Sequence, residues 1–391
     1  MSYTALYRKF RPSTFDDVKG QDHVVKTLKN EIANNRIAHA YIFSGTRGTG
    51  KTSVAKVFAK AVNCEHPVDG NPCNECAMCK AINSGKSLNV VEMDAASNNS
   101  VDNIRDLVED VKYAPSEGRY RVYIIDEAHM LTTEALNALL KTLEEPPEYV
   151  MFILATTEIH KILPTILSRC QRFDFRRIDN KVITARIEEI TDKENVRIEP
   201  AAAEYIARTA DGSMRDALSL LDEVVAYYLG QDISYENTLK VLGAVDNAVY
   251  EELFRAVAAS DVPECMRILR ETMDNGREAG IFVSEFIWHL RNILLIKEAG
   301  KASGIVDASE EAKKHLEEEA GLTDSDTIMN YIKTLSALIN DMKYSIEKRV
   351  LMEICFIKLM KPQMLLADNI ENISQRLKSL ESQVEGILNT P

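Results

Sequence analysis

A short segment from Gly45 to Thr52 carries the residue types that bind phosphate groups, in the order GTRGTGKT. It fits the pattern G-x-x-x-x-G-K-[ST] at every position. Glycines let backbone N–H groups converge on phosphate oxygens, and the first turn of a helix adds a favourable dipole. Lys51 is expected to reach the β and γ phosphates, and the Thr52 hydroxyl is expected to bind Mg²⁺. The residues predicted to contact a nucleotide here are Gly45, Thr46, Arg47, Gly48, Thr49, Gly50, Lys51, Thr52 and Ser53.

The flanking sequence supplies the elements that this loop needs. The apolar run Tyr41-Ile42-Phe43 before it predicts a buried strand, and residues 52–62 after it repeat apolar side chains at helical spacing. A strand that turns through glycines into a helix is the context in which the pattern binds phosphate.

A second apolar run, residues 121–125, ends in Asp126-Glu127-Ala128-His129. Carboxylates at the carboxyl ends of parallel strands lie where ligands bind in open α/β sheets. Asp126 is expected to hold Mg²⁺, and Glu127 is the candidate that polarises an attacking water. The two segments together predict a nucleoside triphosphatase. Residues 180–183, Asn-Lys-Val-Ile, lack the last residue of the guanine-reading pattern Asn-Lys-x-Asp, which favours ATP.

Four of the seven cysteines form a C-x₈-C-x₂-C-x₂-C array: Cys64, Cys73, Cys76 and Cys79. In an intracellular protein such a cluster favours metal binding over disulfides. Four thiolates complete a closed tetrahedral shell around Zn²⁺, so the array predicts a structural zinc site. An iron–sulfur cluster and redox-active thiols are the alternatives.

Composition limits the possible functions. The chain has 391 residues, 45% apolar content and a net charge of −13, which disfavours a free-standing, non-specific DNA-binding protein. The N-terminus does not resemble a signal peptide, and the sequence pattern predicts no stretch of the roughly 20 apolar residues that a membrane span needs. We therefore expect an intracellular, cytoplasmic protein without a membrane partner.

Strand and helix patterns alternate up to about residue 178, which predicts a parallel sheet with both faces covered. The cysteine array at 64–79 is then an insertion in this domain. Residues 179–242 predict a small helical domain, and residues 243–365 a larger all-helical one. Residues 366–391 repeat apolar side chains at heptad spacing, which fits either a short coiled coil or a terminal helix.

Further segments complete a resemblance to a known family. Residues 7–15 (YRKFRPSTF), Gly20-Gln21, Ser168-Arg169-Cys170 and residues 212–216 (GSMRD) resemble clamp-loader AAA+ ATPases. With the phosphate loop and the cysteine array, they resemble the gamma/tau subunits of bacterial DNA polymerase III over about residues 1–361. The resemblance implies an α/β P-loop NTPase (AAA+) core with a zinc-binding insertion, a helical lid and an all-α collar that mediates oligomerisation.

The resemblance also implies a function in DNA replication. Members of this family are motor subunits in a five-membered ring of clamp-loader subunits, which uses ATP to open a sliding clamp and load it on primed DNA. The loop at residues 95–100 is expected to face that DNA and to contact it without sequence specificity. The family belongs to the DNA polymerase holoenzyme, a nucleotidyltransferase assembly, so contact with the polymerase is expected, although the chain itself does not polymerise DNA. Some members carry a longer extension that tethers polymerase and helicase. The short segment after the collar fits either a short form or a shortened piece of a longer chain, so tethering of polymerase and helicase is not part of the expectation.

The family also implies roles for single residues. Arg169 resembles the arginine finger that acts in trans on the ATP of a neighbouring subunit, and Thr157 resembles the sensor that orients the attacking water. Arg215 resembles the lid residue that contacts the γ phosphate of its own chain. The segment expected to cover the adenine contains Tyr7, Arg8, Arg11 and Pro12.

Two alternatives belong to other functional classes. A ring scaffold that binds nucleotide without significant hydrolysis is expected to lack Lys51, Thr52 or Glu127, and all three are present. A sequence-specific zinc-finger regulator is disfavoured by the acidic balance and by the missing Cys₂His₂ pattern.

Overall fold

The computed structural model describes residues 4–115, 117–242, 247–300, 310–343 and 345–361. The chain forms two compact units, residues 1–238 and residues 239–391. The heptad-patterned segment 366–391 lies outside the described residues.

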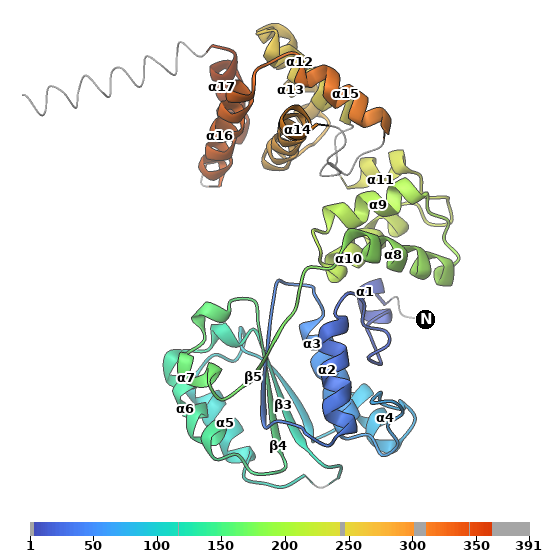
Figure 1. Ribbon diagram of the computed structural model, residues 1–391, viewed down its shortest axis with the longest axis vertical. Helices are drawn as coiled ribbons and strands as arrows, with labels where there is room; N and C mark the ends of the chain where they lie inside the picture. Colours follow the sequence, from blue (N-terminus) through green and yellow to red (C-terminus); the bar gives the residue numbers. More distant parts are fainter. Residues whose placement is uncertain (1–3, 116, 243–246, 301–309, 344, 362–391) are drawn as a thin grey trace, which may run out of the picture. The chain divides into compact units, whose positions relative to one another are not determined.

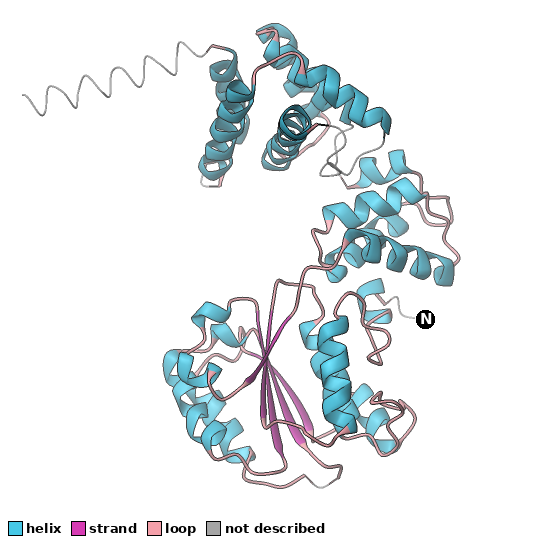
Figure 2. Cartoon of the chain, viewed as in Figure 1, coloured by secondary structure: helices cyan, strands magenta, loops and turns pink. Residues whose placement is uncertain are grey.

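The first unit is built on a five-stranded sheet in the order β2-β3-β4-β1-β5, and every pair in it is parallel. The predicted parallel sheet is therefore confirmed, and Figure 2 shows it in magenta between helices. Its strands are β1 (Ala40–Ser44), β2 (Val90–Asp94), β3 (Arg121–Asp126), β4 (Val150–Thr156) and β5 (Gln171–Asp174).

Helices cover both faces of the sheet, with α2 and α3 on one side and α5, α6 and α7 on the other (Figure 1). Alternate residues of β1 serve the two layers, because Tyr41 packs in one apolar core and Ile42 in the other. All residues of β1 and β4 are buried, as expected for central parallel strands. The helices of this part are α1 (Leu6–Lys9), α2 (Asp22–Ala33), α3 (Lys51–Val62), α4 (Ala77–Asn83), α5 (Val101–Asp110), α6 (Thr133–Glu144) and α7 (Pro164–Leu167), with 3-10 turns η1 (Ala128–Met130) and η2 (Ile159–Lys161).

Local contacts set where two of these elements begin. The Thr132 side chain accepts a hydrogen bond from the Ala135 amide, and α6 begins at Thr133. Leu88 is 78% exposed, and β2 begins two residues later, at Val90.

Helices α8 (Asn180–Glu194), α9 (Pro200–Thr209), α10 (Met214–Tyr227) and α11 (Tyr235–Val241) follow the sheet. The second unit is helical in its described residues and buries one apolar core. Its helices are α12 (Asn247–Ala258), α13 (Val262–Asp274), α14 (Ala279–Ala299), α15 (Glu310–Ala320), α16 (Ser325–Met342) and α17 (Lys348–Met360).

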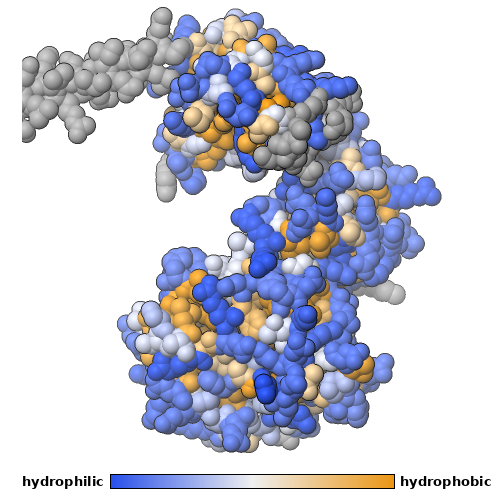
Figure 3. Space-filling model, viewed as in Figure 1, coloured by the Kyte–Doolittle hydropathy of each residue, from blue (hydrophilic) through white to orange (hydrophobic). Residues whose placement is uncertain are grey.

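The sequence pattern predicts no segment long and apolar enough to cross a membrane. Helix α14 corrects that prediction, because its length and composition would allow it to do so. Such a helix is also typical of a protein core, and Phe282, Phe286 and Leu290 pack in the core of the second unit. On the face shown in Figure 3, hydrophilic residues predominate and hydrophobic ones form separate patches.

Candidate nucleotide and metal sites

The phosphate-loop segment connects β1 to α3, as its sequence predicts. Gly50 precedes the helix with φ 101°, a left-handed conformation that only glycine adopts without strain. A side chain at Gly45 would lie 2.4 Å from the Phe175 carbonyl oxygen, so the first glycine allows β1 and the chain after β5 to approach closely. Glycines therefore set both ends of the loop.

The Lys51 side chain folds back over this loop. Its ammonium donates to the carbonyl oxygens of Gly45 (2.9 Å) and Thr46 (2.8 Å). Burial lowers the pKa of Lys51, while the negative charges of Asp126 and Glu127 oppose that shift. The lysine is thus held where it can exchange loop carbonyls for phosphate oxygens.

A hydroxyl and a carboxylate meet at the carboxyl edge of the sheet. The Thr52 hydroxyl donates to Asp126 Oδ2 at 2.7 Å, although the two residues are 74 positions apart. Both are oxygen ligands of the kind that Mg²⁺ prefers, and they adjoin the phosphate loop. Asp126 Oδ1 also accepts from the Glu127 amide at 3.0 Å, which fixes the orientation of the carboxylate.

Glu127 lies in the left-handed region, with φ 47°. A non-glycine residue there is strained by about 1–3 kcal/mol, and such strain is concentrated at functional sites. The Thr157 hydroxyl donates to Glu127 Oε2 at 3.1 Å, and His129 Nδ1 lies 3.4 Å from the same oxygen. Thr157 follows β4, so two strand ends position this carboxylate.

A pocket of about 590 Å³ opens beside these groups. The predicted residues that line it are Tyr7, Arg8, Arg11, Pro12, Arg47, Gly48, Thr49, Gly50, Lys51, Thr52, Ser53, Asp126, Glu127 and Arg215. The lining residues that the sequence patterns missed are Phe10, Asp17, Val18, Lys19, Val54, Ile178, Arg186, Met214 and Leu218. Of the other predicted residues, Gly45 and Thr46 contact Lys51, and Thr157 contacts Glu127.

The helices after the sheet close one side of the pocket. The Arg215 guanidinium lies over the Tyr7 ring, 5.3 Å from its centroid, and Arg11 donates to the Ser53 hydroxyl at 3.1 Å. Arg186 on α8 is only 9% exposed and donates to Glu189 at 2.7 Å. The N-terminal segment is therefore held between the phosphate-loop helix and the helical part.

The phosphate loop also touches α10 directly. Gly48 has φ 75°, and a side chain added there would lie 1.8 Å from the Ser213 hydroxyl oxygen. Ser213 caps α10 by accepting from the Asp216 amide at 3.2 Å. Arg215 lies in the first turn of α10, so the contact between Gly48 and Ser213 links its position to the phosphate loop.

Arg169 lies away from this pocket, just after α7. Its guanidinium donates to Glu144 Oε1 and to the Thr165 carbonyl oxygen, each at 2.6 Å. The side chain is 34% exposed. In this chain Arg169 therefore pairs with Glu144 and does not line the described pocket.

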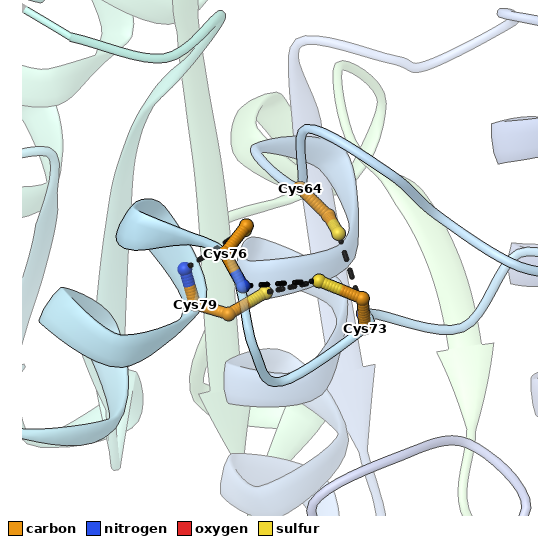
Figure 4. Close-up of side chains that lie close together, drawn as sticks. All are labelled: Cys64, Cys73, Cys76 and Cys79. Atoms are coloured by element: carbon orange, nitrogen blue, oxygen red, sulfur yellow. Dashed lines mark hydrogen bonds between the residues drawn. The ribbon is translucent and has the colours of Figure 1, made fainter.

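The four predicted cysteines come together. Their Sγ atoms all lie within 4.8 Å of one another, and Figure 4 shows the side chains converging. A tetrahedral zinc centre with Zn–S bonds of about 2.3 Å places its sulfur atoms about 3.8 Å apart. The Cys73 and Cys79 sulfur atoms are 4.0 Å apart, so the cluster fits a Zn²⁺ ion with little movement.

Backbone N–H groups surround the sulfur atoms. Cys73 donates to Cys64 Sγ at 3.3 Å, Cys76 to Cys73 Sγ at 3.3 Å and Cys79 to Cys76 Sγ at 3.4 Å. The amides of Cys76 and Glu75 lower the pKa of Cys73 to about 6, whereas burial raises the pKa of Cys64 and Cys79. The donor set is that of a thiolate metal centre.

Comparison with known proteins identifies the family. Three family models match: the delta subunit of DNA polymerase III at residues 20–179, the ATPase lid domain of its clamp-loader subunit at 182–230, and domain III of its subunits gamma and tau at 233–374. DNA polymerase III subunit tau of Bacillus subtilis is 44% identical over 100% of this chain and 69% of that protein. The chain belongs to the gamma/tau family of DNA polymerase III subunits.

Other gamma/tau relatives agree. The gamma/tau subunit of Mycobacterium tuberculosis is 36% identical over 99% of this chain and 67% of that protein. Subunit tau of Escherichia coli is 40% identical over 92% of this chain and 55% of that protein. The gamma/tau chain thus has the AAA+ fold expected from its sequence, with the pocket lined by its α/β part, the helices after it and the N-terminal segment.

Proposed function

We propose that this chain is the ATP-driven motor subunit of a bacterial clamp loader, which opens a sliding clamp and loads it on primed DNA during chromosomal replication. One observation carries the proposal: in a gamma/tau family member, Lys51, the Thr52–Asp126 pair and Glu127 line a single pocket. These are the groups that bind a triphosphate and activate water.

ATP is the proposed nucleotide, with Thr52 and Asp126 as Mg²⁺ ligands. The phosphate-loop amides and Lys51 bind the phosphates, and Tyr7, with the neighbouring N-terminal residues, covers the adenine. The metal ion supplies charge neutralisation on the β and γ phosphates.

The position of Glu127 beside the phosphate loop supports a role for it in hydrolysis. Its carboxylate orients a water and takes up its proton as the water oxygen bonds to the γ phosphorus. The bond between that phosphorus and the bridging oxygen breaks, and the electron pair leaves with ADP. Thr157 holds Glu127, and Arg215 contacts the γ phosphate from the helical lid.

Arg169 serves a neighbouring subunit in this proposal, because its guanidinium lies outside the pocket of its own chain. An arginine supplied in trans stabilises the charge on the transferring phosphoryl group. Subunits arranged in a five-membered ring then depend on each other for hydrolysis.

The proposed partners are the other clamp-loader subunits, the sliding clamp, primed DNA and the polymerase. The chain assists synthesis and does not polymerise DNA. We place it in the cytoplasm, where chromosomal replication proceeds in bacteria. Residues 95–100, which follow β2, are proposed to face DNA without reading its sequence.

The cysteine cluster is proposed to hold one Zn²⁺, with Cys64, Cys73, Cys76 and Cys79 as ligands. A closed shell of four thiolates has no open position for a substrate, so the zinc stabilises the insertion.

The proposed division of the chain is an AAA+ core at 1–178, a lid at 179–242, a collar at 243–365 and a tail at 366–391.

ATP turnover tests the motor function. Turnover is measured with the clamp, the other loader subunits and primer–template all present, and then with each omitted in turn. We expect low turnover in the isolated chain and the highest turnover in the complete mixture. Tight ATP binding without turnover in any mixture would favour the scaffold alternative.

A further inference from the structure

Lys60 is a buried lysine that the proposed ATPase chemistry does not use. It lies near the C-terminal end of α3, the helix that begins at the phosphate loop, and only 4% of the residue is exposed. A buried charge is costly unless it is paired and hydrogen-bonded. Its surroundings therefore indicate what it does.

Of the two amide oxygens that accept hydrogen bonds from Lys60, one lies in the cysteine insertion and the other at the end of α4. Its ammonium donates to Asn74 Oδ1 at 2.5 Å and to Asn83 Oδ1 at 2.9 Å. Asn74 lies between Cys73 and Cys76 and has φ 61°, so it makes the turn that separates these two ligands. Asn83 is the last residue of α4, the helix that carries Cys79. One ammonium thus connects α3 to the turn between Cys73 and Cys76 and to the end of α4.

Lys60 also lies close to the cysteines. Burial lowers its pKa, and the negative charge of Cys79, Asp17, Cys64 and Cys73 in their deprotonated forms opposes that shift. Four thiolates around a divalent ion leave a net negative charge, which a partly buried centre must offset. An ammonium held nearby by two amides supplies that charge without taking a ligand position.

We propose that Lys60 is a positioning residue of the zinc centre, which fixes the metal-binding loop to the phosphate-loop helix and offsets the charge of the thiolates. This role rests on the proposed zinc site. Groups around metal ligands typically contribute tenfold to hundredfold to metal affinity when they orient the ligands. A similar contribution is expected here.

The test is the zinc affinity of the full chain, measured by competition with a chromophoric chelator. Lys60→Met removes the charge and keeps the apolar length, and it should weaken zinc binding by about tenfold or more. Lys80→Met is the matched control, because Lys80 lies exposed on α4 next to Cys79, and this variant should bind zinc within about twofold of the parent chain.

Asn74→Gly provides a second variant if Lys60→Met fails to fold. Glycine tolerates φ 61° and removes one acceptor, so a severalfold loss of zinc affinity is expected. Hydrogen exchange of the last turn of α3 should become faster in both variants. If Lys60→Met folds and its zinc affinity is unchanged, the proposed role of Lys60 is wrong. If Lys60→Met is soluble but unfolded, an unchanged zinc affinity in Asn74→Gly would overturn that role instead.

Other failures remain distinguishable. A parent chain that retains no zinc after purification in its presence would refute the zinc centre itself. ATP turnover of the parent chain in the complete loader mixture is measured in parallel. If Lys60→Met loses zinc affinity, the role of Lys60 is supported. If the parent chain also fails to hydrolyse ATP in the complete mixture, the motor function is refuted independently of that result.

Discussion

The contact between Gly48 and Ser213 leads to a quantitative prediction for Gly48→Ala. A Cβ atom at this position would lie 1.8 Å from the Ser213 hydroxyl oxygen and 2.9 Å from its Cβ, whereas ordinary contact begins at 3.4 Å. The backbone there has φ 75°, which an alanine adopts only with strain. The substitution must therefore displace Ser213 and the first turn of α10.

The cost has two parts. Left-handed strain in a non-glycine residue destabilises the fold by about 1–2 kcal/mol. Displacing α10 also moves Arg215, and a charge-assisted hydrogen bond lost from phosphate weakens binding by about 1.5–3 kcal/mol. At 1.4 kcal/mol per factor of ten, ATP affinity should fall by about tenfold to hundredfold.

Calorimetric titration with ATP and Mg²⁺ measures the effect, and thermal unfolding separates it from the cost in stability. Ser213→Gly supplies the control, because it removes the clashing atoms and costs a helix cap only a few tenths of a kcal/mol. The double variant should regain most of the lost affinity. If the losses of the two single variants simply add, the contact does not position the lid, and the reasoning fails.

Three further substitutions test separate parts of the site. Glu127→Gln should bind ATP normally and lower steady-state turnover by about a hundredfold or more, since the water loses its base; normal turnover would exclude that role. Arg169→Ala should leave ATP affinity of the isolated chain unchanged and lower assembly-stimulated turnover by about a thousandfold, and equal stimulation in both proteins would contradict action in trans. Cys76→Ala should reduce zinc content, measured by elemental analysis, from one equivalent to nearly none and lower the unfolding temperature. Full zinc content in that variant would show that Cys76 is not a ligand.

Local sequence was sufficient to predict a structural feature where one short segment forms all of that feature. The phosphate loop needs only its glycines and the flanking strand and helix, and the central strands β1 and β4 are continuous apolar runs because both faces are covered. The cysteine spacing similarly predicted which four residues converge. The meeting of Thr52 with Asp126 was predictable because parallel strands end at one edge of the sheet.

Other pocket residues could not be found in this way. Arg186 lies within an amphipathic helix like many surface arginines, and only the packing of α8 against the N-terminal segment brings it to the pocket. His129 belongs to a recognised acidic segment, but its contacts with Glu127 and Thr156 depend on the ends of β3 and β4. Such contacts are set by tertiary structure, for which a single sequence has no local signal.

The hydrogen bonds from Lys51 to the carbonyl oxygens of Gly45 and Thr46 affect the entropy cost of binding phosphate. A loop whose lysine is hydrogen-bonded to its own backbone has fewer conformations to lose when phosphate binds. Less ordering entropy then opposes each binding event.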